Sequence, residues 1–254
     1  MNIVVFDTET TNLEKPFCYN IGYVIANVES RQVLLKREFV VEQVWHNPML
    51  FTTAYYADKR ELYVSRMKAR KVVMDKFGYI CQQMLRDFKA YEIEFAFAYN
   101  SPFDTKVFNY NTDWFKCNNP FDDIPIRDIR GFVHNFIAFE KDFQEFCEDY
   151  GYFTESGNYS TTAETVFRYI KGDIDFYEEH TALADSEIEL EILFDCLDKG
   201  AEIDKEYKTY QSIKRETVKQ LTINIDGQES VFEYKSRRNY KDGQGQVNKI
   251  VLKK

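Results

Sequence analysis

The chain opens with an apolar run that ends abruptly in polar residues. Residues 3–6 read Ile-Val-Val-Phe, a pattern typical of a buried strand. Two further segments, 19–28 and 31–41, are rich in Val, Ile, Leu and Phe with partial alternation, and a short polar link joins them. We therefore expect three N-terminal strands that pair as an antiparallel meander.

Helical and extended patterns alternate after this meander. Apolar residues recur every three to four positions between 48 and about 90, most regularly from Arg66 to Phe88, which predicts a helix there. Strands are predicted at 94–99 and 124–129, and helices from Asp104 and over 132–139, 141–150, 162–170 and 181–197. This order predicts an α/β fold with a mixed sheet of about five strands flanked by helices.

The last fifty residues have a different pattern. Residues 204–219 favour a polar helix, and 221–225 and 230–234 alternate around Asp226-Gly227, which is a hairpin turn signal. We therefore divide the chain into a main domain, 1–204, and a C-terminal extension, 205–254. The extension is either a solvated hairpin or an arm that contacts phosphates.

Composition narrows the class of protein. Of the 254 residues, 44% are hydrophobic and 30% are charged, as in soluble globular proteins. The sequence contains no apolar stretch near the ~18 residues of a membrane span and no signal-peptide pattern at its start, so we expect a cytoplasmic protein without membrane contact. The five cysteines are scattered and form no C-x-x-C pair, which indicates reduced structural thiols.

The charge is distributed unevenly along the chain. Residues 205–254 contain 12 Lys and Arg against 6 Asp and Glu, whereas residues 1–204 contain 21 against 36. An acidic body binds nucleic acid poorly by itself, because Lys and Arg that neutralise phosphates supply most of the affinity. Bound metal ions could still let the body handle phosphodiesters, with the basic extension adding affinity.

Two carboxylates stand at the end of the first strand. Side chains two apart in a strand point to the same face, so Asp7 and Glu9 project together. Adjacent anions repel each other and need a counter-charge, which a divalent cation with oxygen ligands supplies. Such a cation needs further oxygen ligands from other parts of the chain.

Two later segments supply such residues. Asn100-Ser-Pro-Phe103-Asp104 follows the 94–99 strand and places a carboxylate at a helix start. His180 lies at the entrance of the 181–197 helix and precedes Asp185 by five residues. This puts an imidazole on a loop beside a carboxylate on a helix, an arrangement suited to a general base next to a metal ligand.

Taken in order, Asp7-x-Glu9, Asn100-x-x-Phe103-Asp104 and His180-x-x-x-x-Asp185 resemble the motifs of the DEDDh (DnaQ-like) 3′–5′ exonucleases. Each motif alone is weak, but together they stand in the expected order on the expected elements. The resemblance covers about residues 1–200, and His180 favours the histidine form of the family. It implies a ribonuclease H-like fold, in agreement with the pattern of elements.

The resemblance also implies roles for individual residues. Two Mg²⁺ or Mn²⁺ ions would be bound, with Asp7 bridging them, Glu9 and Asp185 completing one site, and Asp104 serving the other. His180 would take the proton from the attacking water. Contacts to the substrate are implied for Thr8, Thr10, Leu13, Asn100 and Phe103, with Leu13 as an apolar wedge against the terminal base.

The expected function is a metal-dependent 3′–5′ exonuclease that releases nucleoside 5′-monophosphates from single-stranded ends, with DNA favoured over RNA and a polymerase as a possible partner in trans. An RNA-directed enzyme of the same fold stays open, as does a polymerase-associated binding protein without activity. Each residue also has a structural alternative: an exposed strand end for Asp7 and Glu9, a helix cap for Asp104, a solvated face for Asp185, a surface position for His180 and core packing for Phe103.

Overall fold

The structure is a computed structural model that describes residues 1–54, 56–215, 217–225, 228–237 and 246–251, with side chains described as far as residue 215. It divides into two compact units. The first comprises residues 1–143 and 161–210, and the second comprises residues 144–160 and 211–254. The division predicted from the sequence, 1–204 and 205–254, stays a prediction.

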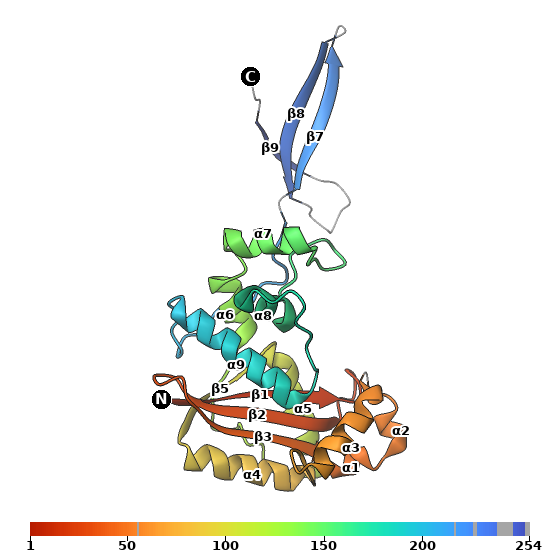
Figure 1. The fold of residues 1–254 in the computed structure, drawn as a ribbon, viewed down its shortest axis with the longest axis vertical. Helices are drawn as coiled ribbons and strands as arrows, with labels where there is room; N and C mark the ends of the chain where they lie inside the picture. Colours follow the sequence, from red (N-terminus) through yellow and green to blue (C-terminus); the bar gives the residue numbers. More distant parts are fainter. Residues whose placement is uncertain (55, 216, 226–227, 238–245, 252–254) are drawn as a thin grey trace. The chain divides into compact units, whose positions relative to one another are not determined.

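The first unit is built on a mixed six-stranded sheet with the order β4-β3-β2-β1-β5-β6 (Figure 1). The central strands β1 (Asn2–Thr10), β2 (Cys18–Asn27) and β3 (Val33–Val41) form the predicted antiparallel meander. The short strands β4 (Val73–Asp75), β5 (Ile93–Ala98) and β6 (Ile126–Asp128) pair in parallel with β3, β1 and β5. The predicted α/β mixed sheet is thus confirmed, with six strands instead of about five.

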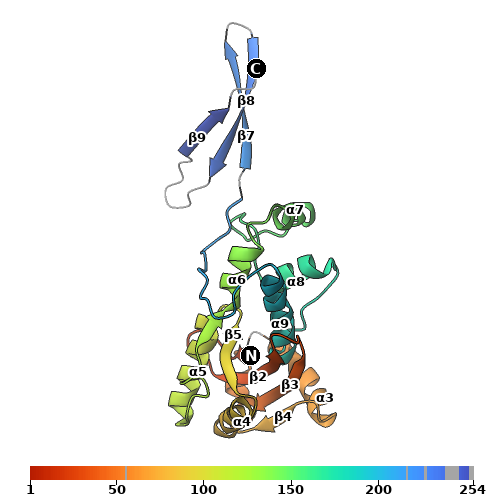
Figure 2. The same cartoon turned by 90° about the vertical axis from the view of Figure 1, so that its left-hand side faces the viewer.

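Helices cover both faces of this sheet. The long helix α9 (Ala182–Asp198) lies across one face and α4 (Phe77–Ala90) along the other (Figures 1 and 2). The helix α5 (Ser101–Phe115) follows β5, as predicted. The remaining helical segments of the first unit are α1 (Glu42–Trp45), α2 (Pro48–Phe51), η1 (Ala57–Lys59), α3 (Arg60–Lys68), α6 (Ile129–Phe136) and α8 (Ala163–Lys171).

A strand interrupts the helix predicted from Arg66 to Phe88, and that prediction was wrong. The helix α3 ends near Arg70, which adopts a left-handed conformation with φ of 58°. Val73 then pairs with Phe39 of β3, which starts the strand β4. Backbone pairing with the sheet edge overrides the local helical spacing of the apolar residues.

The second unit contains residues 144–150 of α7 (Lys141–Tyr150) and a three-stranded antiparallel sheet. Its strands are β7 (Thr217–Ile225), β8 (Gln228–Arg237) and β9 (Gln246–Val251). The two predicted hairpin strands pair as expected, while their Asp226-Gly227 turn lies outside the described residues. The polar helix predicted over 204–219 is wrong, since the described residues from 204 to 215 form no helix.

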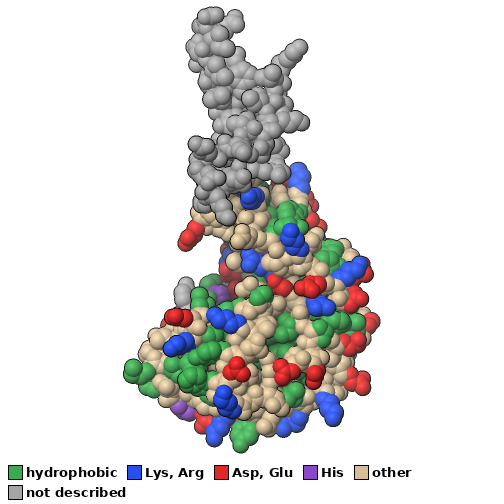
Figure 3. Space-filling model, turned by 180° about the vertical axis from the view of Figure 1, so that it is seen from behind, with side chains coloured by type: hydrophobic (Ala, Val, Ile, Leu, Met, Phe, Trp, Pro, Cys, Tyr) green, Lys and Arg blue, Asp and Glu red, His purple; other side chains and the backbone are tan. Residues whose placement is uncertain are grey.

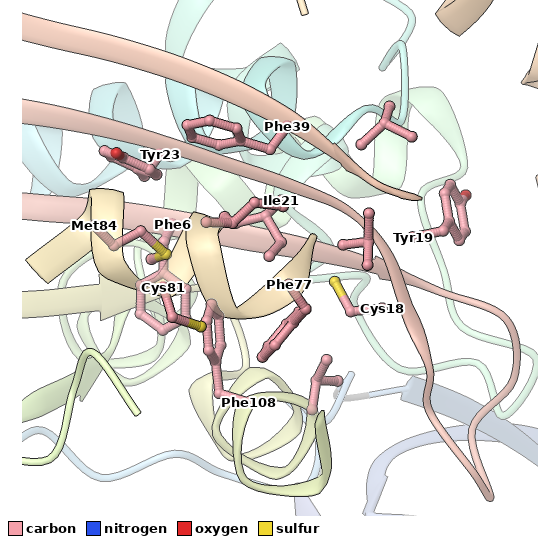
Figure 4. Close-up of a cluster of buried hydrophobic side chains, with 14 of the residues drawn as sticks. Phe6, Cys18, Tyr19, Ile21, Tyr23, Phe39, Phe77, Cys81, Met84 and Phe108 are labelled. Carbon is pink, nitrogen blue, oxygen red and sulfur yellow. The ribbon is translucent and has the colours of Figure 1, made fainter. Parts of the chain in front are cut away.

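The core lies between the sheet and the helices α4 and α5. Phe6 of β1 stacks on Phe121 with ring centroids 4.2 Å apart and meets Phe108 of α5 edge-on. Figure 4 shows the surrounding cluster, with side chains from β1, β2, β3, α4 and α5 pointing toward one another. Since every second residue of β1 enters this core, the alternate residues face α9 on the other side.

The surface and the cysteines agree with the composition. Acidic and basic side chains of the first unit are interspersed on the face shown in Figure 3. All five cysteines are unpaired and four of them are buried, as expected for reduced structural thiols. No helix among the described residues has both the length and the apolar character that a membrane span requires.

Candidate functional site

The strand β1 places its two carboxylates on the face covered by α9. Asp7 pairs with Gly22 of β2, and a side-chain carbon at Gly22 would collide with the backbone of Ala182 and Leu183. The start of α9 therefore rests directly on β2, beside Asp7. Only glycine permits this approach, because the added Cβ would lie 2.1 Å from the Leu183 nitrogen.

Asn20 ties the same helix start to the sheet. Its Oδ1 accepts hydrogen bonds of 2.9 Å from the Ala182 backbone N–H and from the Tyr63 hydroxyl, and its Nδ2 donates to the Phe39 carbonyl at 2.8 Å. Ala182 is the first residue of α9, whose early N–H groups have no partner within the helix. A side chain from β2 thus fixes where α9 begins.

This packing brings three of the predicted ligands together. One carboxylate oxygen each from Asp7, Glu9 and Asp185 lie within 4.8 Å of one another. Asp185 is buried on the first turn of α9, and its Oδ1 has no hydrogen-bond partner among the described residues. Three anions so close together, one with a free buried oxygen, form a site that accepts a cation.

Asp104 approaches the cluster from the other side of β1. It lies buried in the first turn of α5, and its Oδ1 accepts a 2.6 Å hydrogen bond from the Thr8 hydroxyl. Thr8, predicted to contact substrate, is itself buried and donates this hydrogen bond. Burial first, then the charge of Asp7, raises the pKa of Asp104 well above its usual value.

The same causes act on the other carboxylates. Burial raises the pKa of Asp7 to about 7, and it raises that of Glu9 well above its normal range with added repulsion from Asp7. The pKa of Asp185 is also raised, by burial and then by the charges of Asp7, Glu178 and Glu9. Buried acids with raised pKa values bind a divalent cation with release of their protons, because the cation supplies the opposite charge that the ionised forms need.

His180 stands outside regular structure immediately before α9, as predicted. Its backbone has a left-handed φ of 51°, its ring stacks on Tyr56 with centroids 4.7 Å apart, and Tyr177 meets it edge-on. Lys59 donates from Nζ to the backbone carbonyls of Glu179 and His180. These contacts fix the histidine at the edge of the acidic cluster, where burial and then the Lys59 charge lower its pKa.

The remaining predicted residues make contacts of their own near the ends of β1 and β5. Leu13 is 73% exposed after β1, and its carbonyl accepts a hydrogen bond from Lys106. Asn100 adopts a left-handed φ of 65° and donates its backbone N–H to Asp128, while Phe103 packs against the core. Thr10 donates only a long 3.5 Å hydrogen bond, to the Asn12 carbonyl.

Several residues of the site escaped the sequence analysis. Glu178 lies two residues before His180 and within 4.8 Å of both its imidazole and Asp185, and burial raises the pKa of Glu178 to about 7. Arg66 of α3 binds Glu38, Thr181 and Glu179, and so holds the segment before α9. Asn20 and Gly22 carried a readable signal, because a polar residue and a glycine interrupt an otherwise apolar strand.

Comparison with known proteins identifies the fold. Neither a family model nor a curated protein matches the chain. The nuclease domain of 3′hExo, a DEDDh family member solved bound to rAMP, is 14% identical with a TM-score of 0.52, and the match covers 84% of this chain and 97% of that one. A 3′-exonuclease solved in 3′-end-specific recognition of a histone mRNA stem-loop is 14% identical with a TM-score of 0.52. That match covers 91% of this chain and 89% of the other.

A DNA-bound structure has the same architecture. E. coli Exonuclease I in complex with a dT13 oligonucleotide is 12% identical with a TM-score of 0.51, and the match covers 78% of this chain and 41% of that one. The chain therefore has the fold of the DEDDh exonucleases, as the sequence motifs predicted. The predicted ribonuclease H-like sheet is confirmed with it.

Proposed function

We propose that this protein is a metal-dependent 3′–5′ exonuclease that hydrolyses phosphodiester bonds and releases nucleoside 5′-monophosphates. The observation that carries the proposal is the gathering of Asp7, Glu9 and Asp185 within 4.8 Å on a fold of this kind. Asp104 and His180 adjoin them from separate elements, as a DEDDh site requires. Burial of Asp104 and Asp185 disfavours the alternatives of a plain helix cap and a solvated helix face. The charge repulsion among Asp7, Glu9 and Asp104 disfavours an ordinary exposed strand end.

The donor set fits divalent ions such as Mg²⁺ or Mn²⁺. All four acids offer hard oxygen ligands, and the free Oδ1 of Asp185 is a buried acceptor without a donor among the described side chains. Asp7, Glu9 and Asp185 would hold one ion, and Asp7 with Asp104 the other. Two such ions activate a water and stabilise the leaving 3′ oxygen of an in-line displacement.

His180 is proposed as the general base. Its lowered pKa keeps the imidazole neutral near pH 7, so that it can accept a proton from the attacking water. Its Nδ1 lies 3.5 Å from Glu178, which leaves Nε2 for that proton. Lys59, Tyr56 and Arg66 position the ring and the preceding loop without taking part in the chemistry.

The proposed substrate is a single-stranded 3′ end, with DNA favoured over RNA. Leu13 supports a single strand, since an exposed apolar side chain shortly after the β1 carboxylates can wedge against a terminal base. An RNA substrate is the alternative, because two of the similar structures contain rAMP or a histone mRNA stem-loop, whereas Exonuclease I contains DNA. The proposal includes a polymerase as a partner in trans. It also includes a location in the reducing cytoplasm, which the five unpaired cysteines support.

The proposal is tested with 5′-labelled single-stranded DNA and RNA of one sequence, incubated with Mg²⁺, with Mn²⁺ or with EDTA. We expect a ladder that shortens from the 3′ end only when a metal is present. Asp7→Asn should abolish it, whereas the exposed Asp122→Asn serves as a matched control and should retain it. Absence of shortening in every condition, or full activity of Asp7→Asn, would favour the alternative of a binding protein without activity.

A further inference from the structure

A second group of ligand atoms shares Asp185 with the acidic cluster. Glu178, His180 and Asp185 each offer one ligand atom, and these atoms lie within 4.8 Å of one another. This group contains an imidazole nitrogen, whereas the group of Asp7, Glu9 and Asp185 contains only oxygens. The two groups therefore suit different ions, because imidazole favours zinc and similar transition metals while carboxylates alone suit magnesium.

The spacing of the histidine and the glutamate fits a shared ion better than a direct hydrogen bond. His180 Nδ1 and Glu178 Oε2 are 3.5 Å apart, which is long for a hydrogen bond between them. Zinc–nitrogen and zinc–oxygen bonds of about 2.0–2.1 Å at a tetrahedral angle would place two ligand atoms about 3.3 Å apart. The two side chains thus already stand at nearly the separation that one bound zinc ion would impose.

One member of this group carries a buried acceptor without a hydrogen-bond partner among the described residues. Asp185 is only 7% exposed, and its Oδ1 accepts no hydrogen bond from the described part of the chain. The side chains of His180 and Glu178 are 22% and 12% exposed, which leaves an ion a route from solvent.

The histidine is also held in place before any ion arrives. Tyr56 stacks on its ring, and Lys59 binds its backbone carbonyl. A ligand that is already oriented loses little conformational freedom when it binds a metal.

We propose that Glu178, His180 and Asp185 form a binding site for a transition-metal ion of the zinc type, with three protein ligands and one position open to water. An ion bound there occupies His180, the proposed base, and Asp185, the proposed magnesium ligand. It therefore inhibits the magnesium-dependent nuclease, a consequence that rests on the proposed function, whereas the binding itself does not.

The binding is tested with Co²⁺, which substitutes for zinc and has visible absorption that distinguishes tetrahedral from octahedral coordination. Metal-free full-length protein should acquire tetrahedral bands at one equivalent, and added Zn²⁺ should displace them. Glu178→Gln and His180→Gln should lose the bands. The exposed His46→Gln and the neighbouring Asp7→Asn should keep them, because neither residue belongs to the group.

Circular dichroism of each variant confirms that it is folded. The proposed site is wrong if Co²⁺ stays octahedral in the presence of wild-type protein. It is also wrong if folded Glu178→Gln retains the tetrahedral bands.

The inhibitory consequence has its own measurement. Zinc is titrated into the magnesium-dependent reaction, and each variant is compared with its own rate without zinc. The zinc concentration for half inhibition should rise at least tenfold in Glu178→Gln and stay unchanged in His46→Gln. If the protein binds Co²⁺ tetrahedrally but has no nuclease activity, the proposed function is refuted and the metal site is not. If zinc inhibits wild type and Glu178→Gln at the same concentration, inhibition through this site is refuted.

Discussion

Asn20 is the residue on which most of the site geometry depends. It is completely buried, and its side-chain amide connects β2, β3, α3 and the start of α9 through three hydrogen bonds. A buried amide is tolerated because its oxygen and one N–H find these partners. None of these contacts touches a proposed ligand, yet they determine where Asp185 stands relative to Asp7.

We predict that Asn20→Ala destabilises the protein by about 1–3 kcal/mol, because the Ala182 N–H and the Tyr63 hydroxyl lose their buried acceptor. Urea denaturation followed by circular dichroism measures the change. Asn109→Ala, which removes an exposed amide, is the control and should change stability by less than about 0.5 kcal/mol. Equal effects of the two substitutions would contradict this role of Asn20.

His134 is a second buried polar residue, distant in sequence from the site motifs. Its Nδ1 accepts the Tyr210 backbone N–H at 2.9 Å, and its Nε2 lies 3.1 Å from the Thr161 hydroxyl. Burial, with a smaller contribution from the Arg130 charge, lowers the pKa of His134 to about 4. The folded protein therefore holds this imidazole in its neutral form.

A pH dependence of stability follows. The unfolded chain binds the proton of His134 near pH 6.5 and the folded chain only near pH 4, so the unfolding free energy should fall as pH drops between these values. His134→Asn keeps an acceptor for Tyr210 but cannot titrate. The difference in stability between wild type and this variant, followed from pH 7.5 to 4, should shrink steadily; a constant difference would show that His134 is not the group responsible.

The sequence predicted the elements that carry the candidate site residues. Asp7 and Glu9 lie at the end of β1, Asp104 and Asp185 in the first turns of α5 and α9, and His180 in the loop before α9, while their roles stay a prediction. Glu178 was missed although it lies in the His180 segment, because only the packing brings its carboxylate toward Asp185. Arg66 and Lys59 were missed because their partners in the His180 segment lie more than 100 residues away, which local patterns do not report.

At the scale of elements, the contact between β2 and α9 positions the site. Ser186 on the first turns of α9 donates to the carbonyl of Ala182 and lies 3.2 Å from that of Gly22. The helix and strand approach so closely that only glycine fits at position 22. This contact brings Asp185 of α9 close to β2, whose Gly22 pairs with Asp7 of β1.

Gly22→Ala should displace α9 from the sheet. The added methyl group meets backbone atoms at 2.1–2.4 Å, which a side-chain rotation cannot relieve, so we expect a loss of about 3 kcal/mol or more together with a loss of nuclease activity. Gly78→Ala in α4 is the control, since its Cβ would only touch Cys117 at 3.5 Å. This control should keep activity and raise stability by up to about 1 kcal/mol. A stable, active Gly22→Ala would contradict the close contact.

The two wrong helix predictions share one cause, which is docking to a distant partner. The strand β4 exists because Val73 to Asp75 find the free edge of β3. Residues 204–215 stay non-helical because the Tyr207 ring packs on Phe132 and Phe136, and the backbone of Tyr210 binds His134. In both segments tertiary contacts overrode a local helical preference.

At the scale of the whole molecule, the buried acids make folding of the metal-free protein costly. Burial and the neighbouring acids raise the pKa of Asp185 to about 10, so near pH 7 folding requires this carboxyl to take up a proton that the unfolded chain does not bind. Asp185→Asn keeps the shape of the side chain and removes this cost, and we predict that it raises the thermal midpoint of the metal-free protein by about 2–4 °C for each kcal/mol removed. Differential scanning fluorimetry in EDTA, with Asp122→Asn as the control, measures it. A lower midpoint for Asp185→Asn would show that its carboxyl group stabilises the metal-free protein and would contradict this prediction.

The acidic cluster also predicts how metal and pH act together. Because the pKa of Asp7 is raised to about 7, the stability that its protonated form contributes is complete below about pH 4 and is lost as pH rises through 7. Metal-free protein should therefore lose stability over this range, and Asp7→Asn should lose less. Magnesium should stabilise the wild type increasingly as pH rises, because the ligands must be deprotonated to bind it.

The basic extension adds a prediction about salt. If residues 235–254 bind phosphates, replacing Arg237, Arg238, Lys241, Lys249, Lys253 and Lys254 by Gln should weaken binding to single-stranded DNA. The slope of log affinity against log salt should become shallower by about 0.7 for each phosphate that the extension no longer neutralises. Binding is measured with the metal-free protein, so that cleavage does not interfere. An unchanged slope would assign the extension to a structural or partner-binding role.

The packing of α9 on β2 also bears on how distant relatives of this chain are to be recognised. Carboxylates of the kind found in Asp7 and Glu9 occur by chance in many sequences, whereas the geometry here requires a glycine and uses the amide of an asparagine two positions before it, on the strand that follows them. Asn20-Ile21-Gly22 is therefore a fingerprint of this helix placement. A sequence that retains the acids but replaces the glycine must hold its last aspartate by another arrangement.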